Sequence, residues 1–329
     1  MPRRRIRALV LAAGLGTRLR PLTNLTPKPL LPVRGVPILG HTLARLAAAG
    51  CEAAAVNLHY LGDQIRQRFG GSYQGLPLTW SEEPEVLGTL GALYPLREFL
   101  GPADLVLLVN GDSLCAWPLR KLIRRHLASG SRSTLLLTSR PAPARFGGGV
   151  GIDRDGRILS FRQGHPEQGE VAKRYVFAGA HVLSPELLSS LKPGKSDIVR
   201  DLYVPMLAAG EVIGSLVDGG LWHDMGTPQR FLDGTLAGRR SWISPEASLE
   251  AGAKVRRSSI EPGATVEKEA RIEGSVLLPG SRIGQGSVVR GSIVGFGAIV
   301  PPGSRIERRI VMPAPNGVIE TPFDGDAEG

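Results

Sequence analysis

A glycine-containing loop near the N-terminus carries the residues with the clearest chemistry in this chain. Gly14 and Gly16 follow an apolar run, residues 6–12, which we interpret as a buried strand. Glycine lets a backbone turn sharply and bring its N–H groups close to an anionic ligand. Arg18 follows directly, and Lys28 stands in a segment framed by prolines. A backbone cradle with one arginine and one lysine indicates a site for a polyphosphate, such as that of a nucleoside triphosphate.

Two well-known phosphate-binding patterns do not describe this loop. The Walker pattern, Gly-x-x-x-x-Gly-Lys-Ser/Thr, does not occur in the chain. The dinucleotide-binding pattern needs a third glycine where this chain has Leu19. The stretch from Leu9 to Val33 instead resembles, almost residue for residue, the N-terminal motif of the sugar-1-phosphate nucleotidyltransferases. This resemblance implies that Arg18 binds pyrophosphate and Lys28 binds phosphate, both as catalytic residues. It also implies nucleotide contacts from Ala12, Ala13, Gly14, Gly16 and Thr17.

Length and composition agree with a two-domain enzyme. The chain has 329 residues, 42% of them hydrophobic, and no apolar run reaches the roughly 18 residues of a membrane helix. We reject a signal peptide, because the first apolar segment runs into a charged, proline-rich loop. Cys51 and Cys115 provide neither a disulfide framework nor metal-ligand spacing. We therefore interpret them as packing thiols of a cytoplasmic protein, and the lack of a long apolar run predicts no membrane association. The net charge of +10 comes from scattered residues, so we expect no nucleic-acid partner.

The first 240 residues alternate between strand and helix patterns. The continuous apolar run 105–109 is typical of a strand buried on both faces, and residues 39–49 and 119–127 are predicted helices. This rhythm predicts an α/β domain, residues 1–240, with a Rossmann-like, mostly parallel sheet and helices on both faces. Ligands of such sheets bind beyond the carboxyl ends of the strands. The loops after the strands 6–12 and 105–109 therefore belong at the same edge.

Two aspartates are candidate magnesium ligands. Asp112 follows Gly111 at the end of the buried run 105–109, although an aspartate there is also typical of a turn or helix cap. The segment Trp222–Pro228, Trp-His-Asp-Met-Gly-Thr-Pro, resembles the second aspartate motif of the same family. The resemblance implies that Asp112 and Asp224 bind Mg²⁺. We interpret His223 as a neighbour of the metal rather than a base, because a sugar phosphate is already anionic.

The segments that contact base and sugar are less distinctive. Residues 83–91 resemble the family's base-binding corner, but a strand-to-helix loop capped by Thr89 explains them as well. Where many relatives carry a Glu-Lys pair after a phenylalanine, this chain has Arg162-Gln163-Gly164, and Arg162, or Glu170 with Lys173, is the candidate replacement. The resemblance implies nucleotide contacts from Glu83, Gly88, Thr89 and Gly111. It implies sugar contacts from Gly147, Gly148, Arg162 and Gly179.

A repeat of seventeen residues occupies the chain after Ser241. Apolar residues recur in three registers that agree independently: Ile243, Ile260, Leu277, Val294 and Val311; Leu249, Val266, Ile283 and Val300; Val255, Ile272, Val289 and Ile306. One apolar residue per short face and three faces per coil predict a triangular parallel β-helix over residues 241–312. It resembles the left-handed hexapeptide-repeat β-helix, shortened by one residue per coil. Residues 313–329 are predicted to form a tail.

The β-helix allows two interpretations. Many proteins with such repeats are acyltransferases, but those generally use a histidine base, and this chain has none after His223. We therefore interpret the β-helix as a packing or oligomerisation module and expect a homo-oligomer.

Together, these features predict an Mg²⁺-dependent nucleotidyltransferase that makes a nucleotide-sugar from an NTP and a sugar-1-phosphate. The similarity to guanylyltransferases favours GTP and mannose-1-phosphate. Glucose-1-phosphate with dTTP or UTP is an alternative, and a regulatory subunit that binds nucleotide-sugars without turnover is an alternative of another class.

Overall fold

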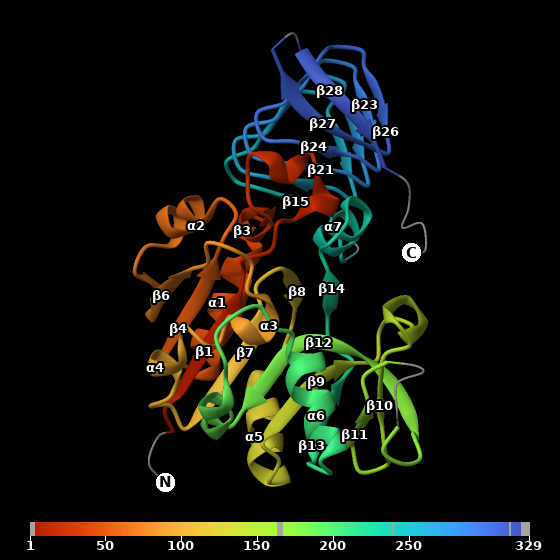
Figure 1. Ribbon diagram of the computed structural model, residues 1–329. Coiled ribbons are helices and arrows are strands. Elements are labelled where there is room, and N and C mark those ends of the chain that lie inside the picture. The colour runs from red at the N-terminus through yellow and green to blue at the C-terminus, as the bar shows by residue number, and fades with distance from the viewer. Residues whose placement is uncertain (1–3, 163–166, 239, 316, 324–329) are drawn as a thin grey trace. The chain divides into compact units, whose positions relative to one another are not determined.

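The chain forms two compact units, which we call unit 1 and unit 2. The computed structural model describes residues 4–162, 167–238, 240–315 and 317–323 (Figure 1). Unit 1 comprises Met1–Gly14 and Leu39–Trp222, and unit 2 comprises Leu15–Ile38 and His223–Gly329. The segment with Arg18 and Lys28 therefore groups with the C-terminal part of the chain.

Unit 1 is built on one mixed sheet. Its strands, as far as the residues are described, follow the order β11-β10-β12-β7-β1-β4-β6-β5, and β9 joins β12 to β13. The centre, β7-β1-β4-β6, is parallel as predicted, whereas β12 is antiparallel to both β7 and β9. The strands are β1 (Ile6–Leu11), β4 (Ala53–Leu58), β5 (Ser72–Tyr73), β6 (Leu76–Glu82), β7 (Leu105–Asn110), β9 (Ser133–Thr138), β10 (Val150–Ile152), β11 (Ile158–Ser160), β12 (Lys173–Leu183) and β13 (Ile213–Asp218).

Helices pack against this sheet, which confirms the predicted α/β class. The apolar run of β7 is buried throughout, because both faces of the central strands are covered. The helices are α1 (Ile38–Ala49), α2 (Gly62–Phe69), α3 (Gly88–Gly91), α4 (Arg97–Leu100), α5 (Leu119–Ser129) and α6 (Val204–Ala208), with 3-10 turns η4 (Pro143–Phe146) and η5 (Pro185–Ser190) and a π-helical turn η6 (Val199–Tyr203). The short strand β8 covers Ser113–Cys115.

A buried histidine lies in the core of unit 1. The His181 Nδ1 atom is 2.7 Å from the Tyr203 hydroxyl, which also accepts a hydrogen bond from Ser133. Burial away from water lowers the pKa of His181 from 6.5 to about 3. The folded protein therefore keeps this imidazole neutral at pH values where the unfolded chain binds a proton.

This histidine is expected to make unfolding sensitive to acid. Below pH 6.5 His181 binds a proton in the unfolded state but stays neutral in the folded state. The contribution of this histidine to the free energy of unfolding is therefore complete above pH 6.5 and is lost as the pH falls towards 3. This one group changes the free energy of unfolding by up to about 1.4 kcal/mol per pH unit. Urea unfolding of the wild type and His181→Leu between pH 7 and pH 4 measures it. Equal slopes for the two proteins would contradict the prediction.

Unit 2 contains the predicted parallel β-helix. Its strands stack in three parallel sheets, and the observed pairs Ile243↔Ile260, Leu249↔Val266 and Val255↔Ile272 match the seventeen-residue register. Residues of the inner rows, such as Leu277 and Val300, are fully buried. The strands are β15 (Trp242–Ile243), β16 (Ser248–Leu249), β17 (Lys254–Arg256), β18 (Ser259–Ile260), β19 (Thr265–Val266), β20 (Arg271–Glu273), β21 (Val276–Leu277), β22 (Arg282–Ile283), β23 (Val288–Arg290), β24 (Ile293–Val294), β25 (Ile299–Val300) and β26 (Arg305–Glu307).

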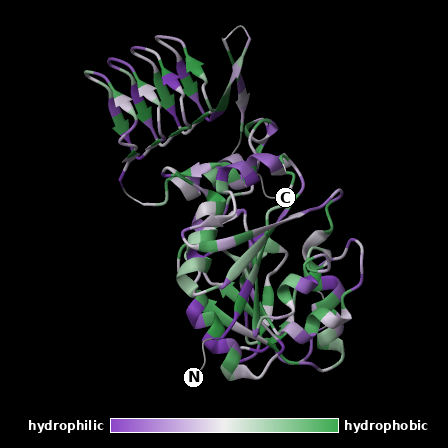
Figure 2. Cartoon of the chain, turned by 90° about the vertical axis from the view of Figure 1, so that its left-hand side faces the viewer, coloured by the Kyte–Doolittle hydropathy of each residue, from purple (hydrophilic) through white to green (hydrophobic). Residues whose placement is uncertain are grey.

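Serines stack at one corner of successive coils. The Ser258 hydroxyl accepts a hydrogen bond from the Ser275 amide, and the Ser275 hydroxyl does the same for the Ser292 amide, each at 3.1 Å. These buried serines satisfy backbone donors that the turns would otherwise leave unpaired. Figure 2 shows hydrophobic and hydrophilic residues side by side in the strands of the stacked coils.

The last coil is followed by a hairpin. Strand β27 (Arg309–Ala314) pairs in antiparallel fashion with β28 (Gly317–Pro322). Part of the segment that we predicted as a tail thus forms a strand. The remaining elements of unit 2 are η1 (Thr17–Leu19), η2 (Leu22–Asn24), η3 (Lys28–Leu30), β2 (Pro32–Val33), β3 (Val36–Pro37) and α7 (Pro228–Thr235), and β14 (Trp222–Asp224) leads into the unit. None of the helices in the described residues has the length and apolar character that crossing a bilayer requires.

Candidate active site

The loop of Gly16 and Lys28 is tightly folded within unit 2. Gly16 has a φ of 61°, and a Cβ atom there would lie 3.1 Å from the Thr23 side chain and 3.4 Å from Lys28 Cβ. Thr23 donates a hydrogen bond to the Gly16 carbonyl at 2.8 Å. A side chain at this position would therefore be both strained and crowded, which explains the glycine.

Unit 2 brings both motifs together around Asp224. Lys28 Nζ lies 4.0 Å from Asp224 Oδ1, and only 6% of the lysine side chain is exposed. Arg230, on α7, donates from Nη1 to Asp224 Oδ2 at 2.6 Å. A Cβ atom at Gly226 would lie 2.7 Å from Arg18 Nη2, so the Arg18 guanidinium rests against this glycine. Three cations around one carboxylate form a positively charged site that suits a polyphosphate.

Sequence reasoning missed Arg230. Its position three residues after Thr227 puts it in the first turn of α7, where the Thr227 side chain caps its amide at 3.2 Å. The signal was available, because Thr227-Pro228 is a typical helix start and a side chain in the first turn lies next to the preceding loop.

In unit 1, the Asn57 side chain forms hydrogen bonds to two predicted nucleotide-binding residues. The Ala12 amide donates to Asn57 Oδ1 at 2.7 Å, and Asn57 Nδ2 donates to Glu83 Oε1 at 2.8 Å. The other carboxylate oxygen of Glu83 accepts a hydrogen bond from the Leu87 amide at 2.9 Å. The buried Asn57 and Glu83 side chains thus link the loops after β1 and β6 to strand β4. A polar residue inside the apolar run of β4 was the only sequence signal for Asn57.

The loop after β7 lies against β1 and β12 within unit 1. The Gly111 amide donates to the Leu11 carbonyl at 2.8 Å, and a Cβ atom at Gly111 would lie 2.9 Å from Val10. At Gly179 a Cβ atom would lie 3.0 Å from the Asn110 amide nitrogen. Asp112 accepts a hydrogen bond from the Ser113 hydroxyl at 3.4 Å. The fold thus brings Gly179, a predicted sugar contact, next to the strand end that precedes Asp112.

The predicted base-binding corner is held by a distant segment of unit 1, residues 194–198. The Ser196 carbonyl accepts from the amides of Leu90 and Gly91, at 3.1 and 3.3 Å. A Cβ atom at Gly88, where φ is 80°, would lie 2.5 Å from that same carbonyl oxygen. This close approach explains why the corner needs glycine.

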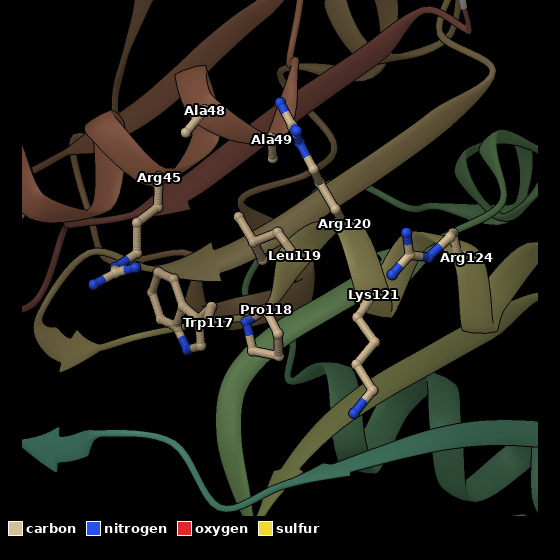
Figure 3. Close-up of a pocket in the computed structure, with 9 residues that line it drawn as sticks. All are labelled: Arg45, Ala48, Ala49, Trp117, Pro118, Leu119, Arg120, Lys121 and Arg124. Atoms are coloured by element: carbon tan, nitrogen blue, oxygen red, sulfur yellow. The ribbon is translucent and has the colours of Figure 1, made fainter.

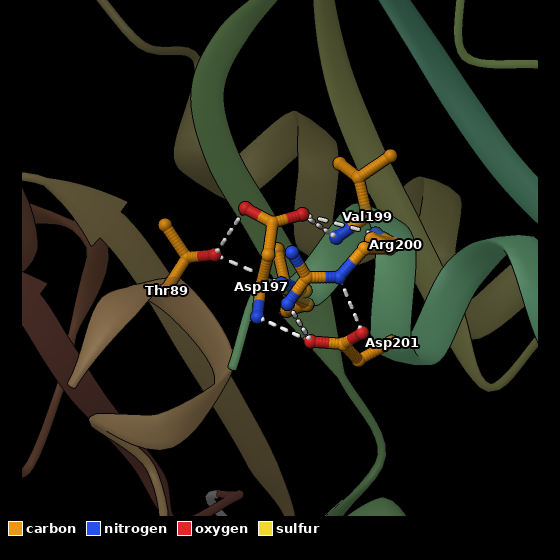
Figure 4. Close-up of polar contacts among 6 residues, drawn as sticks. Thr89, Asp197, Val199, Arg200 and Asp201 are labelled. Atoms are coloured by element: carbon orange, nitrogen blue, oxygen red, sulfur yellow. Dashed lines mark hydrogen bonds and ion pairs between the residues drawn. The ribbon is translucent and has the colours of Figure 1, made fainter. Parts of the chain in front are cut away.

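The Thr89 hydroxyl completes this attachment (Figure 4). It donates to Asp197 Oδ2 at 3.2 Å and accepts from the Ile198 amide at 2.8 Å. The other oxygen of Asp197 accepts from the amides of Val199 and Arg200, at 3.0 and 2.9 Å, and so caps the π-helical turn. Asp197 therefore joins that turn to the corner of Gly88 and Thr89.

The predicted sugar-side loop contains consecutive glycines with positive φ. Gly147 and Gly148 have φ values of 63° and 81°, and a Cβ atom at Gly147 would lie 3.8 Å from the exposed Arg162 side chain. Arg162 therefore lies beside the glycines for which the sequence predicts sugar contacts. Gln163 and Gly164 fall outside the described residues.

A separate concavity of about 490 Å³ lies in unit 1 between α1 and α5. Four basic residues line it, Arg45, Arg120, Lys121 and Arg124, yet their side chains extend in different directions (Figure 3). Cations that diverge do not define a single anion site. None of the residues predicted for the site lines this concavity.

The predicted metal ligands are of a suitable chemical type. Carboxylate oxygens are the hard donors that Mg²⁺ prefers, and both Asp112 and Asp224 supply them. Within the described residues, no three His, Cys, Asp or Glu side chains gather into a metal-binding cluster.

The fold defines an α/β protein with a glycine-containing loop after its first strand, joined to a parallel β-helix. Comparison with known families agrees: the family described as nucleotidyl transferase matches residues 7–240, and the GMPPB C-terminal domain matches residues 238–318. The chain therefore belongs to the nucleotidyl transferase family.

Curated relatives are similar to this chain over about 70% of its length. A mannose-1-phosphate guanylyltransferase of Mycobacterium tuberculosis is 33% identical over 238 residues, which are 71% of this chain and 65% of the relative. The catalytic subunit beta of mannose-1-phosphate guanylyltransferase from Drosophila pseudoobscura pseudoobscura is 32% identical over 231 residues, 69% of this chain and 61% of the relative. The matched region thus spans less than two thirds of these relatives.

Proposed function

We propose that this protein transfers a nucleotidyl group from an NTP to a sugar-1-phosphate, most specifically from GTP to mannose-1-phosphate to give GDP-mannose. The observation that carries the proposal is the pairing of the buried Lys28 with Asp224, with Arg18 and Arg230 beside them in unit 2. The names of the curated relatives support guanylyl transfer over thymidylyl or uridylyl transfer.

The proposed reaction is an in-line phosphoryl substitution. A phosphate oxygen of the sugar-1-phosphate attacks the α-phosphorus of the NTP, and the bond from that phosphorus to the bridging oxygen breaks to release pyrophosphate. Such reactions depend on positioning and on charge neutralisation. Lys28 neutralises charge at the phosphates being joined, and Arg18 stabilises the departing pyrophosphate.

We propose further roles for the residues that contact the nucleotide and the sugar. The backbone at Ala12, Ala13, Gly14, Gly16 and Thr17 contacts the nucleotide phosphates, while the corner at Gly88 and Thr89 contacts the base. Glu83 holds that corner through the Leu87 amide, and Gly111 allows close approach of the nucleotide. On the sugar side we propose Gly147, Gly148, Arg162 and Gly179.

We also propose that Asp112 and Asp224 hold a divalent cation, Mg²⁺, when substrates bind. The cation supplies positive charge to the phosphates. Arg230 and Lys28 orient the Asp224 carboxylate, because both contact its oxygens.

Pyrophosphate release over a grid of four NTPs and several sugar-1-phosphates, with Mg²⁺, tests the function. We expect GTP with mannose-1-phosphate to give the highest kcat/KM. A different productive pair would replace these substrates but keep the reaction class. No turnover on the whole grid, with nucleotide-sugar binding detected by calorimetry, would overturn the enzymatic function in favour of the regulatory alternative.

Asp197→Ala tests how the base-binding corner is held. The variant removes the acceptor of the Thr89 hydroxyl together with the side-chain cap of the π-helical turn. The hydrogen bond to Thr89 is the one that reaches the corner, and its loss corresponds to about 1 kcal/mol, or roughly fivefold in affinity. We therefore expect the KM for the nucleotide to rise by about that factor, with the KM for the sugar phosphate unchanged. Arg200→Ala is the matched control, since it removes only the exposed pair with Asp201. An equal rise in both variants would contradict the assigned role of Asp197.

A further inference from the structure

The second coil of the β-helix, which begins with β18, contains a fully buried carboxylate, that of Glu261. This residue directly follows β18 and continues the coil, as its amide donates to the Leu277 carbonyl at 2.9 Å. Its side chain accepts from the Ser259 hydroxyl at 2.8 Å. Burial raises the pKa of the Glu261 carboxyl, and hydrogen bonds from neighbouring donors oppose that rise. Burying a carboxylate costs free energy, so the groups that donate hydrogen bonds to Glu261 indicate which segment it holds in place.

Besides Ser259, the donors to this carboxylate are two backbone amides of a tight turn that is distant in the sequence. The Arg34 amide donates to Glu261 Oε1 at 3.0 Å, and the Gly35 amide donates to Oε2 at 2.7 Å. Both turn residues have positive φ, 54° and 80°, as a two-residue hairpin turn requires. Such a turn aims its amides outward, and one carboxylate satisfies both of them.

A second contact fixes the same turn. A Cβ atom at Gly35 would lie 3.1 Å from the ring of Trp242, which is the first residue of β15. The Arg34 guanidinium donates to the Ala237 carbonyl at 2.7 Å. The turn is therefore held by the carboxylate of Glu261, by the Trp242 ring and by the chain just before the β-helix.

This turn also holds the segment that contains Lys28. It joins β2 to β3, whose residues Val33 and Val36 pair directly. Beyond that pair, the Ile38 amide donates to the Leu31 carbonyl at 3.0 Å, and the Leu31 amide donates to the Lys28 carbonyl at 3.1 Å. Movement of the turn would thus be transmitted through a short hydrogen-bonded hairpin to Lys28.

We propose that Glu261 is a positioning residue for the reaction: the β-helix anchors the hairpin 32–37 and thereby places Lys28 for catalysis. This inference rests on the proposed function. It gives the β-helix a role in turnover in addition to packing. A shift of about 1 Å in a catalytic group can lower the rate by about 10²-fold, which sets the expected size of the effect.

The test compares Glu261→Ala and Glu261→Gln with the control Glu267→Ala. Glu267 is the residue of the same type at the next corner of the coil, and its carboxylate contacts Arg282 and the Gln285 amide within the β-helix. Amide hydrogen exchange at Arg34 and Gly35, together with kcat and both KM values for pyrophosphate release, is measured well below the lowest Tm. We expect Glu261→Ala to exchange faster at these amides and to lose about 10²-fold in kcat, with smaller changes in KM. Glu261→Gln retains one acceptor and should be intermediate, and the control should match the wild type.

Several outcomes would overturn the inference. Faster exchange with an unchanged kcat would show that the turn does not position Lys28. An equal loss of kcat in Glu267→Ala would show a general effect of the coil. If the wild type releases no pyrophosphate, the proposed function fails, and the inference is decided by calorimetry with tripolyphosphate: weaker binding to Glu261→Ala, but not to Glu267→Ala, supports it, and equal binding to all variants overturns it.

Discussion

Lys28→Met is expected to lower kcat for pyrophosphate release by about 10²–10³-fold, the loss typical for removing one electrostatic contact to the transition state. The Lys28 side chain is buried and its Nζ lies 4.0 Å from Asp224 Oδ1. Its charge therefore acts in surroundings that screen it poorly, where a positive group has the largest effect on phosphate chemistry. Methionine keeps most of the apolar stem, so the charge is removed with little change in packing.

The matched control is Lys254→Ala. Lys254 is an exposed lysine of the same unit, in β17, and its removal changes the net charge of the protein by the same amount. We expect its kcat and Tm to stay at wild-type values. Retention of more than a tenth of the wild-type kcat by Lys28→Met, in a protein with an unchanged Tm, would mean that Lys28 is not catalytic.

Gly88→Ala is expected to raise the KM for the nucleotide by about 10²-fold, the effect of displacing a binding group by about 1 Å. The added Cβ would lie 2.5 Å from the Ser196 carbonyl oxygen, a backbone atom that can move only if the segment 194–198 moves with it. The corner of Gly88 and Thr89 would have to shift, and the contact with the base that we propose for it would be lost. Initial rates at varied GTP and fixed mannose-1-phosphate measure the effect.

Gly75→Ala separates this crowding from backbone strain. Gly75 has a φ of 78°, close to the 80° of Gly88, but a Cβ there meets no atom within 4 Å. An L-residue at positive φ costs about 1 kcal/mol, so both variants should lose a similar amount of stability from that cause. Only Gly88→Ala should change the KM for the nucleotide. The same KM in both variants would argue against nucleotide binding at this corner.

Much of the fold could be predicted because its signals are local and repeated. Each coil of the β-helix needs apolar residues at the same three positions, so Ile260, Leu277 and Val294 recur at one spacing and pair in that register. The run Leu105–Val109 is continuous because both faces of β7 are covered. A pattern that every coil or strand must satisfy can be recognised without knowing the path of the chain.

The polar connections could not be predicted in this way. Asn57 bridges Ala12 and Glu83, and Asp197 holds Thr89, through hydrogen bonds between segments distant in sequence. A single asparagine or aspartate has no periodicity, and its partner is decided by which loops the fold brings within about 3 Å. Each of these hydrogen bonds involves a residue that the motifs had already predicted for the site.

The sequence by itself determined the α/β domain, the β-helix register and the two motifs that contain Lys28 and Asp224, because apolar periodicity and motif spacing are properties of the chain alone. Only the tertiary structure decided that Lys28 and Arg230 meet at Asp224, and that the hairpin 32–37 joins the β-helix through Glu261. The physical reason is that buried charges and turn amides must find partners wherever the packed chain places them, and that place is set by the whole fold rather than by neighbouring residues.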